Sequence, residues 1–489
     1  MQSKNPTVDT PAGIIHGAAV GRVHAFQGIR YGANAGRFKA VVPIAQSGAS
    51  PQVPPCAFPQ NKNRLEFVMG DAIHGLPQAE DAFLLDLWVP ENHAGKLPVL
   101  VFIHGGAFIS GGGSGTRYDG AMFAQEQSAI VVTLNYRLGA LGHLAIDRVS
   151  DGNLPFDDIL CALGWIRDNI ARFGGDPANV TVAGQSAGAW YAYLLGVSPA
   201  AQGLLRRNVL FSLPFFPPMA QAAAAELAAA FGEMLGGADP SEAAVEDLLA
   251  VQGKVMRGTA RFGDLTLGFY PVASDGKVPA SLFDYAKSAA DAHIEGTLAG
   301  YTREENAAFM IQDPRTRNPD PAAVDQWFRG HFGAMGGIKR SYLDSLRPAP
   351  TPYTSLVDGG THISFASPTV QVAASFGRRG LNSWLYRFDL QSGTPDLHSP
   401  HCMELPFLFA NRRQWTDAAM LAGIDDRAFD RAGRCFRHAI GSFARGDAPG
   451  FTPADPWAQF REGAWTCHLF GDTDHAGTIS LEPSAFIEN

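Results

Sequence analysis

A strand that runs into a tight turn limits this chain to few folds. The segment is Val180-Thr-Val-Ala-Gly-Gln-Ser-Ala-Gly188, and its apolar, β-branched start predicts a buried strand. Its Gly-x-Ser-x-Gly ending predicts a sharp turn into a helix, with glycine needed at 184 and 188 because the neighbouring backbone leaves no room for a Cβ. We therefore expect Ser186 at the tip of the turn, with its hydroxyl exposed and the N–H of Ala187 free to bind an oxyanion.

A second segment has to support this pentapeptide, because Gly-x-Ser-x-Gly alone arises by chance and also fits an ordinary glycine turn. The run Leu97-Pro-Val-Leu-Val-Phe-Ile-His-Gly-Gly-Ala-Phe108 predicts a strand buried on both faces that ends in small residues. Such residues let backbone N–H groups turn inward, as an oxyanion hole requires. A flexible glycine loop is the alternative, whereas the absence of Gly-Lys-Ser/Thr argues against a phosphate site.

Two later segments supply an acid and a histidine. They are Thr297-Leu-Ala-Gly-Tyr-Thr-Arg-Glu-Glu-Asn306 and His401-Cys-Met-Glu-Leu-Pro-Phe-Leu-Phe409. A serine hydroxyl becomes a good nucleophile when a base takes its proton, and a carboxylate orients that base. The order serine, acid, histidine is that of α/β-hydrolases, which predicts a mainly parallel, doubly wound central sheet.

Further ordered motifs make the chain resemble the type-B carboxylesterases, the family of bacterial para-nitrobenzyl esterases, animal carboxylesterases and cholinesterases. The likeness extends over nearly the whole chain. It includes Phe26-Gln-Gly-Ile-Arg-Tyr31, Glu80-Asp-Ala-Phe-Leu-Leu-Asp-Leu-Trp-Val-Pro90, Asn135-Tyr-Arg-Leu-Gly-Ala-Leu-Gly142 and Trp165-Ile-Arg-Asp-Asn-Ile-Ala-Arg-Phe-Gly-Gly-Asp-Pro177.

The resemblance implies a role for each matching residue. Ser186 would be the nucleophile, His401 the base and Glu305 the acid, with Glu304 as the alternative acid because Asn306 replaces a family glycine. His398 is the alternative base, although His401 heads the family pattern His-x-x-Glu-Leu.

The remaining expected site residues surround these three. The oxyanion donors would be the N–H groups of Gly106, Ala107 and Ala187. The expected supporting and pocket residues are Gly105, Gln185, Ser212, Phe215 and Phe216, with ordinary core positions as the alternative for the two phenylalanines. The resemblance also implies that Arg37, Glu80, Arg137 and Asp158 form structural ion pairs.

Two departures from the family pattern narrow the range of substrates that we expect. Gln185 replaces the usual glutamate beside the nucleophile, and Asp71-Ala-Ile-His-Gly75 lacks the aromatic residue that holds choline in cholinesterases. We expect neutral carboxylic esters, hydrolysed through an acyl-enzyme without a cofactor or metal. The alternatives are amide, carbamate or lactone hydrolysis by the same residues, and a non-catalytic binding or adhesion role.

The five cysteines indicate a reducing compartment. They are scattered, show no Cys-x-x-Cys spacing, and include Cys56, whose disulfide partner in secreted relatives is replaced here by Ala82. Cys402 is a competing nucleophile, disfavoured because Ser186 fills that role. The start of the chain shows no signal-peptide pattern and no segment is long enough to cross a membrane, so we expect a cytoplasmic protein.

Length and composition fit one large enzyme domain. The 489 residues are 46% hydrophobic and carry a net charge of −9, which argues against nucleic-acid binding, and nothing indicates the oligomeric state. We expect a core over residues 1–205, helical insertions with the acid over 206–375, and the histidine loop within 376–489. Predicted strands cover 98–103, 129–135, 180–184 and 382–388, and predicted helices cover 156–173, 220–235 and 425–445.

Overall fold

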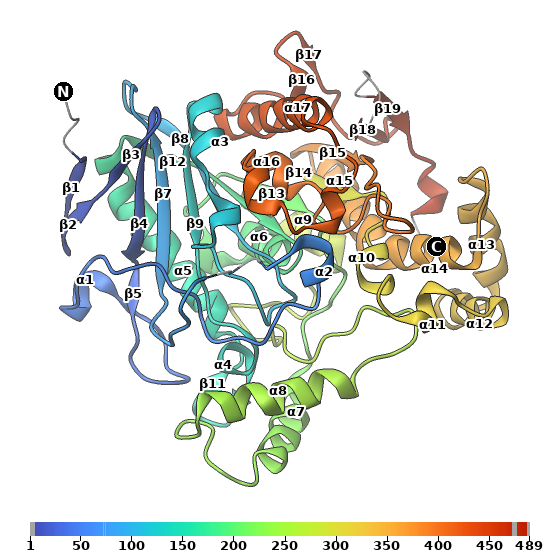
Figure 1. Ribbon diagram of the computed structural model, residues 1–489, viewed down its shortest axis with the longest axis horizontal. Helices are drawn as coiled ribbons and strands as arrows, with labels where there is room; N and C mark the ends of the chain where they lie inside the picture. Colours follow the sequence, from blue (N-terminus) through green and yellow to red (C-terminus); the bar gives the residue numbers. More distant parts are fainter. Residues whose placement is uncertain (1–4, 72, 74, 472–476, 487–489) are drawn as a thin grey trace.

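One large sheet organises the computed structural model, which describes residues 5–71, 73, 75–471 and 477–486 (Figure 1). Eleven strands of the described residues form it. In spatial order they are β19 (Gly477–Ser480), β18 (Thr466–Phe470), β15 (Asn382–Phe388), β14 (Gly296–Thr302), β13 (Arg207–Phe211), β12 (Gly175–Gln185), β8 (Leu97–Ile103), β9 (Ile130–Leu134), β7 (Leu84–Pro90), β4 (Val23–Arg30) and β3 (Ala18–Val20).

The centre of the sheet is parallel and its two edges are antiparallel. Neighbouring strands from β9 to β18 pair in parallel, whereas β3, β4 and β7 on one side and β19 on the other pair antiparallel. Every residue of β8, β9, β13 and β14 is buried, as expected for apolar runs covered on both faces. The mainly parallel central sheet predicted from the sequence is confirmed.

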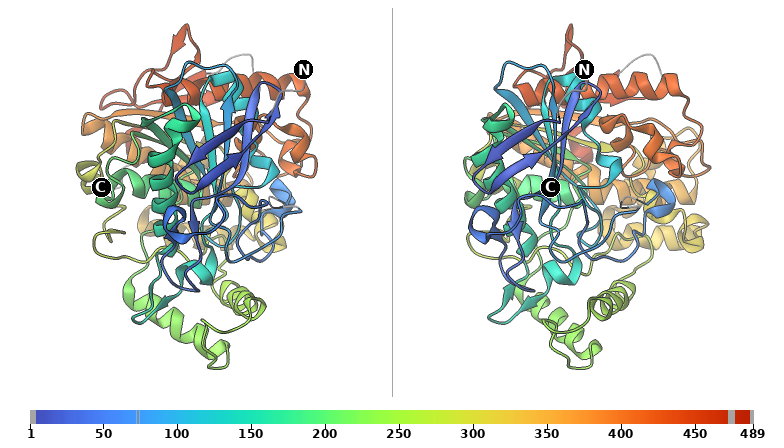
Figure 2. Two further views of the ribbon diagram at one scale, coloured as in Figure 1. Left: turned by 90° about the vertical axis from the view of Figure 1, so that its left-hand side faces the viewer. Right: turned by 60° about the vertical axis from the view of Figure 1, so that its left-hand side comes forward.

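Helices cover both faces of this sheet and create a hydrophobic core on each. One face packs against α5 (Leu154–Asn169), α6 (Ala187–Val197) and α15 (Ser367–Arg378). The other packs against α3 (Ala121–Gln127), α16 (Leu405–Phe409) and α17 (Asp426–Arg445), so that α5 and α17 lie on opposite sides in Figure 2. This arrangement is the doubly wound α/β sheet that the sequence predicts.

Most remaining helices belong to the expected insertion region. They are α7 (Gln221–Met234), α8 (Val245–Gly258), α9 (Tyr285–Asp291), α10 (Ala307–Met310), α11 (Pro314–Arg317), α12 (Pro321–Phe332), α13 (Gly336–Ser345) and α14 (Pro352–Thr361). The pair α7 and α8 protrudes at the lower end of the molecule in Figure 1, whereas α10 to α14 lie beside the carboxyl ends of the parallel strands.

The described residues also form small two-stranded sheets and short helices outside the central sheet. The four two-stranded sheets are β1 (Thr7–Thr10) with β2 (Gly13–His16), β5 (Gly32–Ala33) with β6 (Val42–Pro43), β10 (Ala145–Ile146) with β11 (Ser150–Asp151), and β16 (Gly450–Thr452) with β17 (Asp455–Pro456). The short helices are α1 (Ile44–Ser47), α2 (Glu66–Met69) and α4 (Gly139–His143). No helix of the described residues is long and apolar enough to span a bilayer.

The predicted element boundaries hold within a few residues, with two corrections. The helix expected over 156–173 begins at Leu154 and ends at Asn169, and a 3₁₀ turn covers 170–173. The strand expected over 180–184 is longer, because Gly175 already pairs with Leu97 before a bulge that ends at Val180. The residues between carry no apolar run, so periodicity does not reveal them.

The expected structural ion pairs are confirmed. Arg37 binds Glu80 at 2.6 Å, and the buried Arg137 binds Asp158 at 2.6 Å. The second pair ties the chain after β9 to helix α5. These four residues therefore belong to the scaffold beneath the site.

Candidate active site

Ser186 occupies the turn between β12 and α6, in a backbone conformation that residues other than glycine seldom adopt. Its φ is 56° and its ψ is −120°, and its N–H donates to Phe211 O at 2.9 Å. A Cβ at Gly184 would overlap the Gly188 backbone, and one at Gly188 would overlap Ile103 O. The two glycines therefore allow the close approach of strand and helix, which holds the serine at the carboxyl end of the sheet.

Glu305 and His401 form a buried hydrogen-bonded pair. Glu305 follows β14 closely, and its Oε1 accepts from the N–H of Thr302 at 2.7 Å. Its Oε2 accepts from Nδ1 of His401 at 2.5 Å, and the two side chains are 0% and 1% exposed. Because a carboxylate only accepts, Nδ1 carries the proton and Nε2 presents a lone pair.

The structure places the two alternative residues elsewhere. Glu304 accepts from the guanidinium of Arg347 at 2.9 Å and from the N–H of Ser399 at 3.1 Å. The buried Nε2 of His398 has no hydrogen-bond partner among the described residues. The geometry thus joins His401 to Glu305 and assigns Glu304 to a separate ion pair.

The loop after β8 presents unused backbone donors beside Ser186. Gly106, Ala107 and Phe108 have φ values of 121°, 55° and 63°, so three successive residues occupy the left-handed half of the Ramachandran plot. The Gly106 carbonyl accepts from the N–H of Ser110 at 3.0 Å, which closes the loop. Within the described chain the N–H groups of Gly106, Ala107 and Ala187 have no partner, and all three residues line the cavity that contains Ser186.

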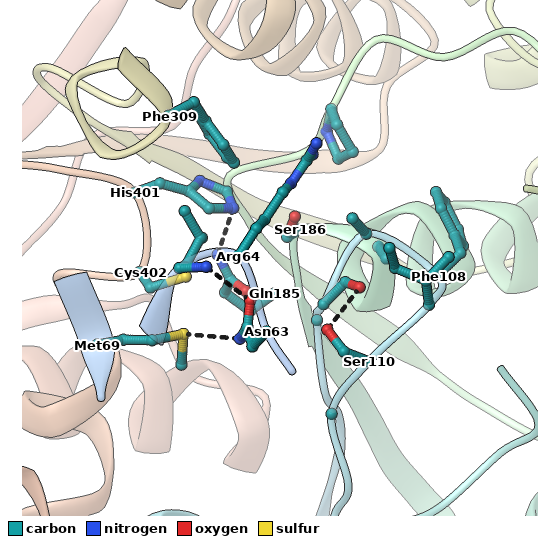
Figure 3. A pocket seen from close by; sticks show the side chains of 18 of the residues that line it. Asn63, Arg64, Met69, Phe108, Ser110, Gln185, Ser186, Phe309, His401 and Cys402 are labelled. Carbon is teal, nitrogen blue, oxygen red and sulfur yellow. Dashed lines mark hydrogen bonds between the residues drawn. The ribbon is translucent and has the colours of Figure 1, made fainter. Parts of the chain in front are cut away.

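The Gln185 side chain lies between this loop and the histidine (Figure 3). Its Nε2 donates to Nε2 of His401 at 3.1 Å, and a Cβ on Gly105 would overlap its Oε1. In this structure the lone pair of His401 is therefore bonded to the Gln185 amide rather than to the Ser186 hydroxyl. The sequence indicated only that Gln185 lacks the negative charge of the usual glutamate.

Two buried acidic groups lie behind the pair. Burial raises the pKa of the Cys402 thiol well above its usual range, so this thiol stays protonated, unlike a nucleophilic cysteine. Burial first, and then the charge of Glu305, raise the pKa of Glu404 to about 8. Ser212 donates to Glu404 Oε1 at 3.4 Å, so this serine supports the pair through Glu404.

Aromatic and aliphatic side chains line the cavity of the site, which has a volume of about 70 Å³. The rings of Phe309 and Phe365 lie 5.1 and 4.8 Å from the His401 ring. Phe216 lines the cavity as expected, but Phe215 does not: it is 39% exposed and lines a neighbouring cavity. Further apolar lining residues are Leu65, Met69, Phe108, Tyr118, Leu265 and Leu267.

Arg64 and the ring pair Phe309 and Phe365 were missed by the sequence analysis. Phe309 lies just after the acid segment, so its proximity to that segment was the available signal. Arg64 lies in a stretch without periodicity, and nothing in the sequence marks it as a cavity residue. In the stretch 71–75, Ala72 and His74 lie outside the described residues.

A mostly parallel, doubly wound sheet with a serine elbow, an acid and a histidine at the carboxyl ends of its strands defines an α/β-hydrolase. Residues 4–468 match the model of the carboxylesterase family. The chain is 32% identical over 479 residues to the probable N-octanoylanthranilate hydrolase AqdA2 of Rhodococcus erythropolis, covering 96% of this chain and 99% of that protein. It is 31% identical to the para-nitrobenzyl esterase of Bacillus subtilis strain 168, covering 83% of each.

The solved structures agree. The carboxylesterase EST55 of Geobacillus stearothermophilus superposes with a TM-score of 0.82 at 26% identity, covering 98% of this chain and 100% of the other. The chain belongs to the carboxylesterase family and is a carboxylic ester hydrolase.

Proposed function

We propose that Ser186, His401 and Glu305 hydrolyse neutral carboxylic esters in two steps through an acyl-enzyme. The observation that carries this proposal is the 2.5 Å bond from His401 Nδ1 to Glu305, which leaves the Nε2 lone pair facing the cavity of Ser186. A base so oriented can take a hydroxyl proton.

Acylation begins when the Gln185 amide releases His401 Nε2. Nε2 then takes the proton of Ser186 as Oγ attacks the ester carbonyl, and Glu305 stabilises the imidazolium. The oxyanion is bound by the N–H groups of Gly106, Ala107 and Ala187, each typically worth about 3 kcal/mol of transition-state stabilisation.

In the rest of the cycle His401 acts first as an acid and then again as a base. The imidazolium of His401 protonates the departing alcohol as the tetrahedral intermediate collapses, which leaves the acyl group on Ser186 Oγ. His401 then takes a proton from water, the hydroxyl adds to the acyl carbonyl, and Ser186 regains its proton as the acid leaves.

The test is hydrolysis of 4-nitrophenyl esters from acetate to decanoate by wild type and Ser186→Ala, with Ser241→Ala on an exposed loop as the matched control. We expect kcat to fall by at least about 10³-fold in Ser186→Ala and to stay unchanged in the control. Acyl-enzyme mass on the Ser186 peptide would support the covalent step. A Ser186→Ala protein with full activity, or a folded wild type inactive on every ester, would refute it; the second result would favour a binding or adhesion role.

Amide hydrolysis is the second candidate. It is favoured by the likeness to the probable N-octanoylanthranilate hydrolase, which extends over 96% of this chain and whose name gives an N-acyl substrate. Carbamates and lactones would use the same residues. Comparing 4-nitroanilides with 4-nitrophenyl esters of the same acyl group decides between them, because the anilide needs stronger protonation of its leaving group.

A reducing compartment, such as the cytoplasm, is supported by the cysteines. All five are free, and the position of the family's disulfide partner for Cys56 is Ala82. Fractionation of the native host tests the location, and recovery of the enzyme in a secreted fraction would contradict it.

A further inference from the structure

Arg64 places a cation inside the cavity of Ser186. It lies just before α2, and its long side chain extends across the cavity in Figure 3, between His401 and Phe309 on one side and Ser186 on the other. Its Cζ lies 5.4 Å from the centroid of the Phe309 ring. One guanidinium N–H donates to Thr266 O at 3.4 Å, a long bond that leaves most of its donors free.

This guanidinium has no carboxylate partner among the described residues, unlike two buried arginines of the same molecule. Arg117 binds Asp417 at 2.5 Å, and Arg437 binds Glu126 at 2.6 Å. No described residue that lines the cavity is acidic. An unpaired guanidinium in a largely apolar cavity is available to bind an anion that enters the cavity.

The charge of Arg64 persists at neutral pH although protein surrounds it. The surrounding protein lowers its pKa to about 10 through desolvation, so it stays protonated. The side chain itself is exposed to the open cavity, so a ligand can reach its donors. A planar guanidinium with free donors binds a carboxylate through two parallel hydrogen bonds.

The position of Arg64 indicates which part of a substrate it meets, given the proposed function. The substrate carbonyl oxygen would be directed to Gly106 and Ala107, and the leaving oxygen to His401, which protonates it. A leaving group beside His401 therefore lies near the ring of Phe309, which is 5.1 Å from the His401 ring, and near the Arg64 guanidinium, whose Cζ lies 5.4 Å from the Phe309 ring.

We propose that Arg64 binds a carboxylate on the leaving group of the substrate, so that the enzyme prefers esters of carboxylate-bearing alcohols or phenols. The inference rests on the proposed function and refines it. Neutral esters would still react, and a leaving group with a carboxylate would react faster because its charge is paired in the cavity.

The test compares 3-carboxyphenyl butanoate with 3-carbamoylphenyl butanoate, which differ in charge but little in shape. We expect wild-type kcat/KM to favour the carboxylate by about 10- to 100-fold, as for a charge-assisted hydrogen bond. In Arg64→Met this ratio should fall to about 1, whereas Lys254→Met, which removes an exposed cation of α8 that does not line the cavity, should keep the preference. The ratio is measured within each protein, so a partly unfolded variant does not bias it.

Three results would overturn the proposal. The first is equal kcat/KM on both esters in wild type, a result that would still be consistent with the proposed ester hydrolysis. The second is an Arg64-dependent preference for a carboxylate on the acyl part, in the monophenyl ester of glutaric acid, and none on the leaving group.

The third concerns binding without turnover. Ser186→Ala should bind 3-hydroxybenzoate more tightly than 3-hydroxybenzamide by calorimetry, and equal affinities would refute the role of Arg64 even if no ester were hydrolysed. Failure of the proposed function would instead appear as loss of turnover on every ester.

Discussion

Replacing Glu404 by glutamine tests whether a protonated acid lies behind the Glu305–His401 pair. Glu404 is 1% exposed, its Oε1 accepts from Ser212 at 3.4 Å, and its Oε2 has no protein partner within the described chain. Burial and the charge of Glu305 raise its pKa from 4.5 to about 8, so it carries a proton at neutral pH. Glutamine has the same shape as this protonated acid and does not ionise.

The sign and size of the effect follow from proton linkage. Between pH 4.5 and 8 the folded state keeps the Glu404 proton while the unfolded state loses it, so the free energy of unfolding falls as pH rises. Each pH unit within that window is worth about 1.36 kcal/mol, which gives at most about 5 kcal/mol over the window. The negative charges of Glu404 and Glu305 repel each other, so the two groups titrate as a coupled pair and part of the shift belongs to Glu305. We therefore expect a change in unfolding free energy of at least about 2 kcal/mol.

Other shifted groups cancel in the comparison. Burial lowers the pKa values of His104 and His143 to about 4 and raises that of Asp86 to about 7, and these groups are present in both proteins. The quantity of interest is therefore the difference in unfolding free energy between Glu404→Gln and wild type.

Urea unfolding at pH 5.0 to 9.0, checked for reversibility, measures this difference. The difference in unfolding free energy should shift in favour of Glu404→Gln by about 2–4 kcal/mol from pH 5.0 to 8.5. Glu226→Gln, on the exposed face of α7, should follow wild type. Parallel pH dependences of Glu404→Gln and wild type, within about 0.5 kcal/mol, would refute the idea that Glu404 is protonated.

Two ion pairs give further tests. Asp158→Asn leaves the Arg137 guanidinium buried without its carboxylate, so urea unfolding should show a loss of about 3–5 kcal/mol, against less than about 0.5 kcal/mol for Asp168→Asn on the surface. The hydrogen bond that His331 donates to the Asp264 carboxylate raises the pKa of His331, so its contribution to stability is present at pH 5.5 and is lost as pH rises above that pKa. Asp264→Asn should therefore lower the unfolding free energy at pH 5.5 by up to about 1 kcal/mol and by less at pH 9; a loss larger at pH 9 would contradict the assignment.

The parts of the fold that depend on local pattern could be predicted from the sequence. The strand Asn382–Phe388 has the expected bounds, because it is an apolar, aromatic-rich run that Gly380 and Asp389 flank. The helix after Leu154 was placed two residues late, because Pro155 obscured its start although proline suits the first turn. Gly175 pairs with Leu97 of β8, a contact between residues distant in sequence, and the polar residues that follow form a bulge, so no local pattern reveals this start of β12.

The same distinction holds within the site. Ser186 could be predicted because its backbone conformation requires glycines at fixed spacing, and the acid and histidine because their chemistry requires a fixed order. Phe215 and Phe216 are adjacent and chemically identical, yet Phe216 lines the cavity of Ser186 and Phe215 does not. Which of the two meets the site depends on how the chain leaves β13, and residue type does not record that path.

The charged and neutral groups around Ser186 together indicate which substrate charge the site favours. The sequence shows that Gln185 brings no negative charge to the nucleophile, and the structure adds that Glu404 is neutral and that Arg64 is an unpaired cation. The nearby carboxylate of Glu305 accepts the hydrogen bond from His401. A cationic ester would thus meet Arg64 without a compensating anion, whereas a carboxylate would complete a pair. The same residues that disfavour choline-like substrates therefore favour anionic ones, and the two preferences should weaken together in Arg64→Met.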